Sequence, residues 1–125
     1  MAKSIIQNSK HCYVTGDDKN LHKHHIFNGN GLRKWSESQG LWIYLRYDIH
    51  ENLHDGSGLA YELKRIGQYY FEKYHSRAEF IARTHKNYLT TPLSNYEKEK
   101  YHIDPDVLDL SVMDDLDLVL VRTNI

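Results

Sequence analysis

Histidine is the residue type that most clearly suggests chemistry in this chain. Nine of the 125 residues are histidines, and five of them share a short window: His22, His24, His25, His50 and His54. If residues 48–55 are helical, His50 and His54 project from the same face, so both imidazoles could reach one metal ion. Pairs at this spacing also arise by chance in a chain so rich in histidine.

The adjacent pair His24-His25 is more informative, because two neighbouring histidines are hard to explain as packed core. The pair lies in an extended segment, residues 21–27, just before the flexible loop at residues 28–31. Neighbouring residues in a strand face opposite sides of it. One histidine could therefore bind a metal while the other faces a substrate, provided that the chain bends there.

Short elements must position these side chains. The turn residues at 16–20 separate two extended segments, residues 12–14 and 21–27, which predicts a β-hairpin. Residues 41–45, Leu-Trp-Ile-Tyr-Leu, are β-branched and aromatic enough to form a buried strand. A short helix is then expected to begin at Asp48, with Glu51 in its first turn, and to stop at Gly56 or Gly58.

Two helices and an acidic tail are predicted farther along. One apolar face predicts an amphipathic helix over about residues 58–74, and a capping pattern at Ser76 and Glu79 opens a shorter helix that fades near His85. Residues 107–112 and 116–121 alternate partly, which predicts an acidic β-hairpin. The chain is thus expected to be an α+β protein with a body at residues 1–90 and a tail at residues 91–125.

Charge is distributed unevenly between these parts. Residues 1–90 hold 13 Lys/Arg and 9 Asp/Glu, whereas residues 91–125 hold 3 and 8. A basic body is compatible with a phosphate-bearing partner. The length excludes a two-domain enzyme, and an apolar fraction of 40% excludes a disordered chain. No apolar run reaches the roughly 18 residues of a membrane span, and the polar start lacks a signal segment, so a cytoplasmic protein without membrane contact is expected.

The order and spacing of several segments resemble the HNH, or ββα-metal, endonucleases, and among them the small HNH proteins common in bacteriophage genomes. These segments are residues 21–27 (Leu-His-Lys-His-His-Ile-Phe), Arg33-Lys34, Ser36-Glu37, Gly40, residues 42–45, His50 and His54. The likeness covers residues 11–89. It implies a ββα-metal core with added C-terminal helices, in which His24, His50 and His54 bind a metal and His25 is the general base.

The resemblance has two departures. Many family members bind a structural zinc through two Cys-x-x-Cys knuckles, but here the matching stretches are residues 12–15 and 46–49, where only Cys12 supplies a thiolate. Because a structural zinc needs four ligands, we predict none. The cross-link that a structural zinc provides would be replaced by packing in a core made of Trp42, Tyr44, Leu63 and Ile66. The asparagine that orients the base in many members also has no counterpart, since Gly40-Leu41 stands near its place.

The implied reaction is metal-dependent hydrolysis of DNA phosphodiester bonds. His25 would take a proton from water, and one divalent ion would stabilise charge on the phosphate. Imidazole ligands favour Zn²⁺, Ni²⁺ or Mn²⁺. Mg²⁺ also remains a candidate for the bound ion, because it is abundant. Arg33 and Lys34, expected in a loop between the halves of the site, would bind backbone phosphates, so sequence specificity is expected to be weak.

Two alternatives remain open from the sequence. Loss of the knuckles favours a catalytically inactive HNH-derived phage protein that binds DNA or inhibits a host protein, whereas retention of the four histidines favours catalysis. The acidic tail has three interpretations: a hairpin that pairs two subunits into a homodimer, a DNA mimic that covers the basic face, or a disordered segment. If the chain is encoded by a bacteriophage, the protein is expected in the cytoplasm of the bacterial host cell.

Overall fold

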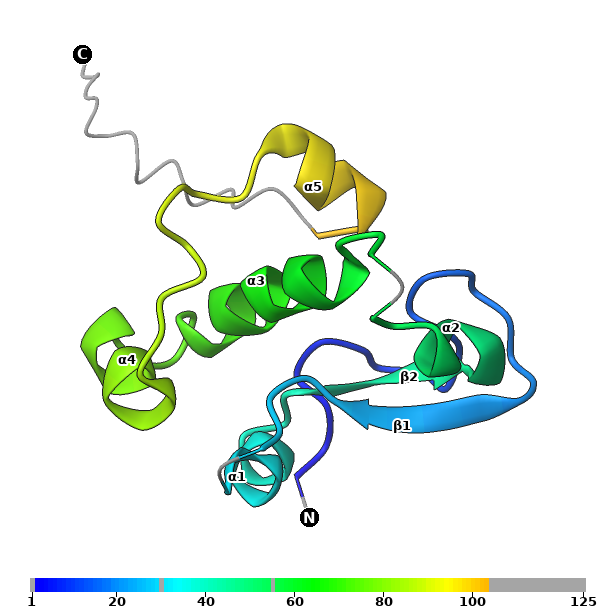
Figure 1. The fold of residues 1–125 in the computed structure, drawn as a ribbon, viewed down its shortest axis with the longest axis horizontal. Coiled ribbons are helices and arrows are strands. Elements are labelled where there is room, and N and C mark those ends of the chain that lie inside the picture. The colour runs from blue at the N-terminus through cyan, green and yellow to red at the C-terminus, as the bar shows by residue number, and fades with distance from the viewer. Residues whose placement is uncertain (1, 30, 55, 104–125) are drawn as a thin grey trace. The chain divides into compact units, whose positions relative to one another are not determined.

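The computed structural model describes residues 2–29, 31–54 and 56–103. Its chain divides into two compact units, Met1–Leu93 and Ser94–Ile125. The first unit combines a two-stranded sheet with helices (Figure 1), which confirms the expected α+β class. None of the helices in the described ranges is both long and apolar enough to span a bilayer.

The sheet pairs strand β1 (Leu21–His25) with strand β2 (Trp42–Arg46) in antiparallel register, with His24 opposite Ile43 and His25 opposite Trp42. The predicted partner of β1, residues 12–14, was therefore wrong. That stretch folds into a local turn, because the Gly16 amide donates to the Cys12 carbonyl at 2.8 Å and the Cys12 amide donates to the Asp17 carbonyl at 2.7 Å.

Helix α1 (Leu32–Ser38) connects the two strands and was not predicted. Arg33 and Lys34 therefore lie on a helix rather than in a loop, which corrects that expectation. Gly40 then turns the chain into β2 with a φ of 71°. A side chain there would also clash with the Lys3 carbonyl, because the N-terminal segment passes close by.

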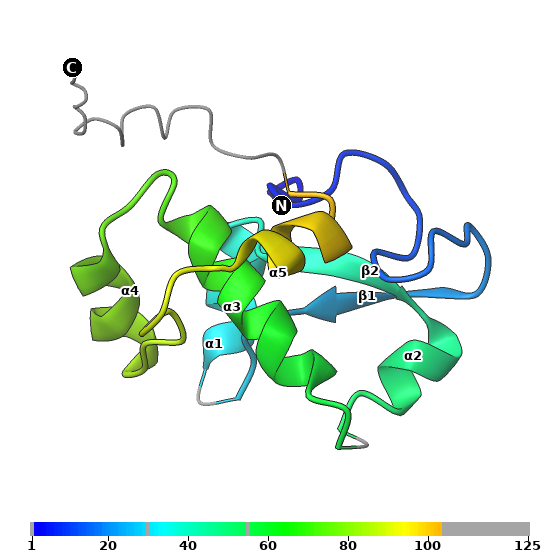
Figure 2. The same ribbon diagram turned by 90° about the horizontal axis from the view of Figure 1, so that it is seen from above.

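Helix α2 (Tyr47–Glu51) follows β2 directly, at the end of the hairpin opposite α1 (Figure 2). It starts one residue before the predicted cap at Asp48, which instead lies in the first turn and pairs with Arg46. The helix is shorter than predicted. It ends at Glu51, so His54 lies beyond it and does not share a helical face with His50.

The remaining helices of the first unit, α3 (Leu59–Phe71) and α4 (Arg77–Thr84), match the predicted segments. The predicted capping box at Ser76 and Glu79 is confirmed, and α4 ends at His85. In the second unit, α5 (Asn95–Lys100) begins with a second capping box that was not predicted. The predicted acidic hairpin, residues 107–121, lies outside the described residues.

The core of the first unit fixes the position of the sheet. Gly67 of α3 allows close contact with the chain that leaves β1, because an added Cβ would lie 2.9 Å from the Phe27 ring and 3.0 Å from an Ile26 methyl carbon. Of the four expected core residues, Trp42, Leu63 and Ile66 are buried and Tyr44 is half-buried. The other large buried side chains of this unit include Leu41, Ile43, Leu45, Phe71 and Phe80.

Candidate functional site

Strand β1 presents its histidines on two faces, as alternation along a strand requires. His22 and His24 lie on the face that meets α2, where both rings contact His50. Lys23 and His25 lie on the other face, where both bind Glu37 of α1. The structure therefore brings His24 and His50 together and places His25 on the opposite side of the strand.

The cluster on the α2 face contains three imidazoles. The ring centroids of His24 and His50 are 5.1 Å apart, and those of His22 and His50 are 5.3 Å apart. His22 Nδ1 and His50 Nδ1 lie 3.1 Å apart, within hydrogen-bond distance. His22 also packs edge-on against the Tyr47 ring at 5.0 Å.

The contact between His22 and His50 sets which nitrogens are available for a metal. Two neutral imidazoles can share this hydrogen bond only if one carries its proton on Nδ1. When His50 donates, its Nε2 keeps a free lone pair, and His22 acts as the partner that fixes its tautomer and ring orientation. This geometry supplies a physical basis for an orienting role of His22.

Both ligand candidates on this face favour the uncharged form. Burial lowers the pKa of His24 to about 4, and positive charge on His50, His25, His54 and Lys64 adds to this effect. Burial also lowers the pKa of His50, with a further contribution from His22 and an opposing one from Glu51. Neutral imidazole is the form that binds a metal, so at pH 7 no proton has to be removed from His24.

The separation of the His24 and His50 rings is the one expected for two ligands of a single metal ion, whereas the third predicted ligand does not complete the set. At a metal to nitrogen distance of about 2.0–2.1 Å, two imidazole centroids around a tetrahedral ion lie about 5 Å apart, which matches the 5.1 Å between these rings. His54 is exposed and lies near enough for its charge to act on His24. Within the described ranges, no three His, Cys, Asp or Glu side chains form a group ready to hold a metal.

His25 is held by a carboxylate that sequence analysis did not assign. Its Nε2 lies 2.6 Å from Glu37 Oε1, and Lys23 Nζ lies 2.9 Å from the same oxygen. Hydrogen bonds from His25 and then from Lys23 lower the pKa of Glu37, so the carboxylate is ionised at neutral pH. With Nε2–H donating to Glu37, the free lone pair of His25 is on Nδ1, which could accept a proton from water.

Glu37 had only been noted as part of the family resemblance. Its role depends on α1, because that helix carries the carboxylate to the Lys23 and His25 side of β1. Arg33 and Lys34 are exposed on the same helix, and Arg33 lies one turn before Glu37. A cation that could bind phosphate therefore shares a helix with the carboxylate that holds the candidate base.

Cys12 lies where residues 12–15 contact residues 46–49. Its buried Sγ accepts hydrogen bonds from the Arg46 amide at 3.2 Å and the Thr15 amide at 3.5 Å. Burial raises the pKa of this thiol, but hydrogen bonds from Thr15, Arg46 and Val14 outweigh burial and lower it overall. The absence of a structural zinc stays a prediction.

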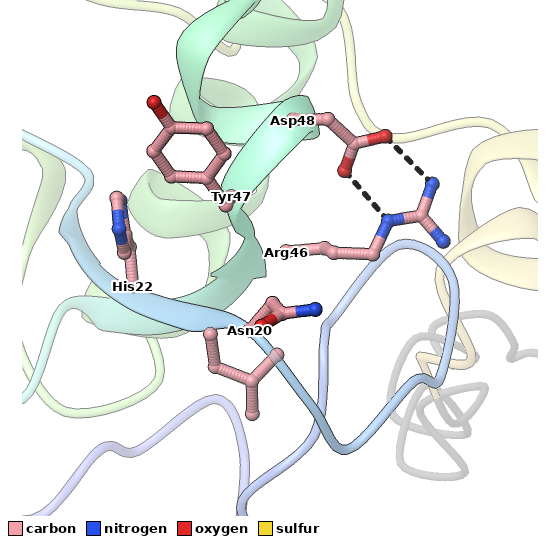
Figure 3. Close-up of a pocket in the computed structure, with 6 residues that line it drawn as sticks. Asn20, His22, Arg46, Tyr47 and Asp48 are labelled. Atoms are coloured by element: carbon pink, nitrogen blue, oxygen red, sulfur yellow. Dashed lines mark hydrogen bonds and ion pairs between the residues drawn. The ribbon is translucent and has the colours of Figure 1, made fainter.

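A pocket of about 500 Å³ opens beside His22 (Figure 3), and it is lined by Asn20, Leu21, His22, Arg46, Tyr47 and Asp48. The Arg46 guanidinium is held by Asp48 on one side, with Nε 2.6 Å from Oδ1, and by Asp17 on another. These carboxylates raise the pKa of Arg46 and neutralise its charge. The pocket is therefore a poor receptor for a phosphate group.

No known family model, curated protein or solved structure matches this chain. Among the described residues, two features have chemical capacity: His24 and His50 on the α2 face of β1, and the His25–Glu37 pair on the opposite face.

Proposed function

We propose that the chain is a metal-dependent endonuclease of the HNH type, which hydrolyses DNA phosphodiester bonds with weak sequence specificity. One observation carries the proposal. Adjacent histidines at the end of β1 lie in two different environments, because neutral His24 faces His50 while His25 is bonded to an ionised carboxylate. Metal binding and proton abstraction require these two environments.

The order of elements adds support. Two antiparallel strands precede a helix, with the histidine pair on the first strand and His50 on the helix. The contact between Cys12 and Arg46 also joins the two stretches that carry knuckles in HNH proteins. The contacts of His24 with His50 and of Cys12 with Arg46 join residues far apart in the sequence. They are therefore evidence from the fold that is separate from the residue spacing on which the resemblance rests.

The chemistry of phosphodiester hydrolysis assigns roles to the side chains. A divalent ion held by His24 and His50 would supply Lewis-acid stabilisation of the phosphate charge, and His54, beyond the end of α2, would have to turn toward it to become the third ligand. His25 Nδ1 would accept the proton of the attacking water, and Glu37 would hold the ring and stabilise the imidazolium that forms. Arg33 and Lys34 would bind the backbone on either side of the cleaved bond.

In the described part of the chain no strand pairs with the outer edge of β1, so this edge is where both groups would act on one phosphate. The far edge of β2 is occupied by the N-terminal segment, since Ser4 Oγ donates to the Trp42 carbonyl at 2.6 Å and the Tyr44 amide donates to Gln7 Oε1 at 2.7 Å. β1 is thus the strand left at the side of the sheet. A backbone phosphate along this edge could meet His24 from one face and His25 from the other.

The opposite placement of His24 and His25 favours a second candidate function. A phosphate that cannot reach both faces would not be hydrolysed, and the chain would then be a catalytically inactive HNH-derived protein that binds DNA or inhibits a host protein. Arg33 and Lys34 would still bind backbone phosphates in that case. Cleavage separates the two functions.

Nicking of supercoiled plasmid tests the proposal. The wild-type protein is incubated with Mg²⁺, Mn²⁺, Ni²⁺, Zn²⁺ or EDTA, and His25→Ala is compared with the exposed His85→Asn as a matched control. We expect cleavage with at least one metal, none with EDTA, and a loss of about 10²-fold or more in His25→Ala only. Cleavage that persists in EDTA, or that survives His25→Ala unchanged, would contradict the proposal.

A further inference from the structure

A second groove, on the face of the sheet that carries Lys23, Trp42 and Tyr44, has a composition suited to an anionic chain. Its volume is about 520 Å³, and it lies between the N-terminal segment and the sheet. Of the described residues that line it, three are lysines, two are aromatic and none is acidic: Lys3, Lys10, Lys23, Trp42 and Tyr44 are joined by small polar residues and amides. The groove therefore carries positive charge next to aromatic rings.

The groove is built into the fold, because the N-terminal segment is fastened along the strand. Besides the bonds from Ser4 and Gln7 to β2, the Ile5 amide donates to the Gly40 carbonyl at 2.9 Å. The Trp42 indole donates to the Ala2 carbonyl at 3.2 Å. Lys3, between the attached residues Ala2 and Ser4, and Lys10, beyond Gln7, are both exposed and held near the sheet by these attachments.

Two of the lysines rest on the aromatic rings. Lys23 Nζ lies 4.0 Å from the centre of the Trp42 ring, and Lys10 Nζ lies 5.6 Å from the centre of the Tyr44 ring. A phosphate that attracts these ammonium groups would uncover the ring faces for stacking with a base. The lysine–ring contacts would thus be exchanged for lysine–phosphate and base–ring contacts, which is the combination found in single-strand binding.

We propose that this groove binds single-stranded nucleic acid, with phosphates on Lys3, Lys10 and Lys23 and a base against Trp42 or Tyr44. The substrate class deepens the proposed nuclease function and rests on it. A cavity of this volume holds about one or two nucleotides, whereas a duplex keeps its bases stacked inside and offers none to the rings. The side-chain amide of Asn8 in the lining suits a nucleobase edge better than a lipid headgroup. The Gln7 amide holds the wall of the groove instead, since it is bonded to the Tyr44 amide and the His11 carbonyl.

The groove also communicates with the candidate base. Lys23 and His25 bind the same carboxylate, with distances of 2.9 and 2.6 Å to Glu37 Oε1. A phosphate that draws Lys23 away leaves Glu37 to His25 alone. Occupation of the groove would therefore alter the surroundings of His25 as well as holding the strand.

Fluorescence anisotropy in EDTA, where cleavage is not expected, tests the groove with the full-length protein. The probes are a labelled oligothymidylate and a duplex of equal length. We expect the single strand to bind more tightly. The double variant Lys3→Gln, Lys10→Gln should weaken its binding about tenfold and reduce the salt slope by about 1.4, since each lost phosphate contact on a single strand contributes about 0.7.

The matched control is Lys19→Gln, Lys86→Gln, which removes two exposed lysines outside the groove and should leave the affinity near that of the wild type. Tryptophan fluorescence adds a readout of stacking. The oligonucleotide should quench it, whereas inorganic polyphosphate, which has no bases, should not. Equal affinity for duplex and single strand, or an equal loss in both double variants, would overturn the proposal.

Two further outcomes keep the proposals distinct. If the protein binds the single strand through Lys3 and Lys10 but never nicks plasmid, the groove proposal stands and the proposed nuclease function fails. If the protein nicks plasmid normally but binds single strands equally well after Lys3→Gln, Lys10→Gln, the proposed nuclease function stands and the groove proposal fails. Binding to vesicles of phosphatidylserine and phosphatidylcholine, without binding to oligonucleotides, would overturn the groove as a nucleic-acid site.

Discussion

Acidification should weaken the fold of the metal-free protein through His24. This imidazole is 7% exposed, and burial lowers its pKa to about 4, whereas an unfolded histidine has a pKa of about 6.5. Between these values the unfolded chain binds a proton at residue 24 that the folded chain does not bind. The stabilising effect of neutral His24 is therefore full above pH 6.5 and is lost as the pH falls toward 4.

The size of this effect follows from the two pKa values. At pH 5 most unfolded molecules carry the proton on His24 and few folded molecules do, which lowers the free energy of unfolding by about 2 kcal/mol relative to pH 7.5. Urea denaturation in EDTA at both pH values measures this change. Wild type is compared with His24→Asn, which cannot take up the proton, and with His85→Asn, a substitution of an exposed histidine at a positive φ that asparagine tolerates.

We expect the difference in unfolding free energy between wild type and His24→Asn to change by about 2 kcal/mol between pH 7.5 and 5, with wild type losing more. The difference between wild type and His85→Asn should stay constant. If wild type and His24→Asn respond equally to pH, His24 is not the buried neutral imidazole that metal binding at pH 7 requires, and the ligand assignment loses its physical basis.

Three other substitutions or deletions test neighbouring parts of the site. Glu37→Gln should lower kcat for plasmid nicking about tenfold with little change in KM, because a charge-assisted hydrogen bond of about 1.5 kcal/mol is lost at a partly exposed group. Glu37→Asp should retain part of the rate. An unchanged kcat in Glu37→Gln would exclude an orienting role for Glu37. His22→Asn should weaken Ni²⁺ binding by about tenfold through loss of the partner of His50, whereas equal affinity would make His22 a plain strand residue. Deletion of residues 94–125 removes 3 Lys/Arg and 8 Asp/Glu, so cleavage should be kept or raised with a steeper salt dependence, and a folded 1–93 fragment without cleavage would assign the tail to the active assembly. Deletion from residue 91 should also destabilise the protein, because buried Arg65 donates to the carbonyls of Thr91 and Pro92.

Local signals in the sequence were sufficient for some elements. The helix α4 was predictable because its capping box lies within four residues, Ser76 to Glu79, and needs no tertiary contact. The face of α3 was predictable from its apolar period, since Leu63 and Ile66 are buried where the period places them. Strand β2 was recognisable from β-branched and aromatic residues alone.

The pairing of β1 and the extent of the site depended on signals that the sequence lacks. Helix α1 begins after Gly31, with no side-chain cap and no acidic residue in its first turn, so nothing marked it as a helix between two paired strands. Without α1, Glu37 could not be placed beside His25. Helix α2 ends at Glu51 without a glycine stop, and the assumption that it continued put His54 on the same face as His50.

Calorimetric titration with Ni²⁺ or Zn²⁺ tests the central claim, that His24 and His50 hold one metal ion beside the candidate base, most directly. We expect one ion per wild-type chain, unchanged binding in His85→Asn, and loss of binding in His24→Ala and in His50→Ala. Equal metal uptake by wild type and His24→Ala would contradict the claim, as would a wild-type protein that binds no metal at all.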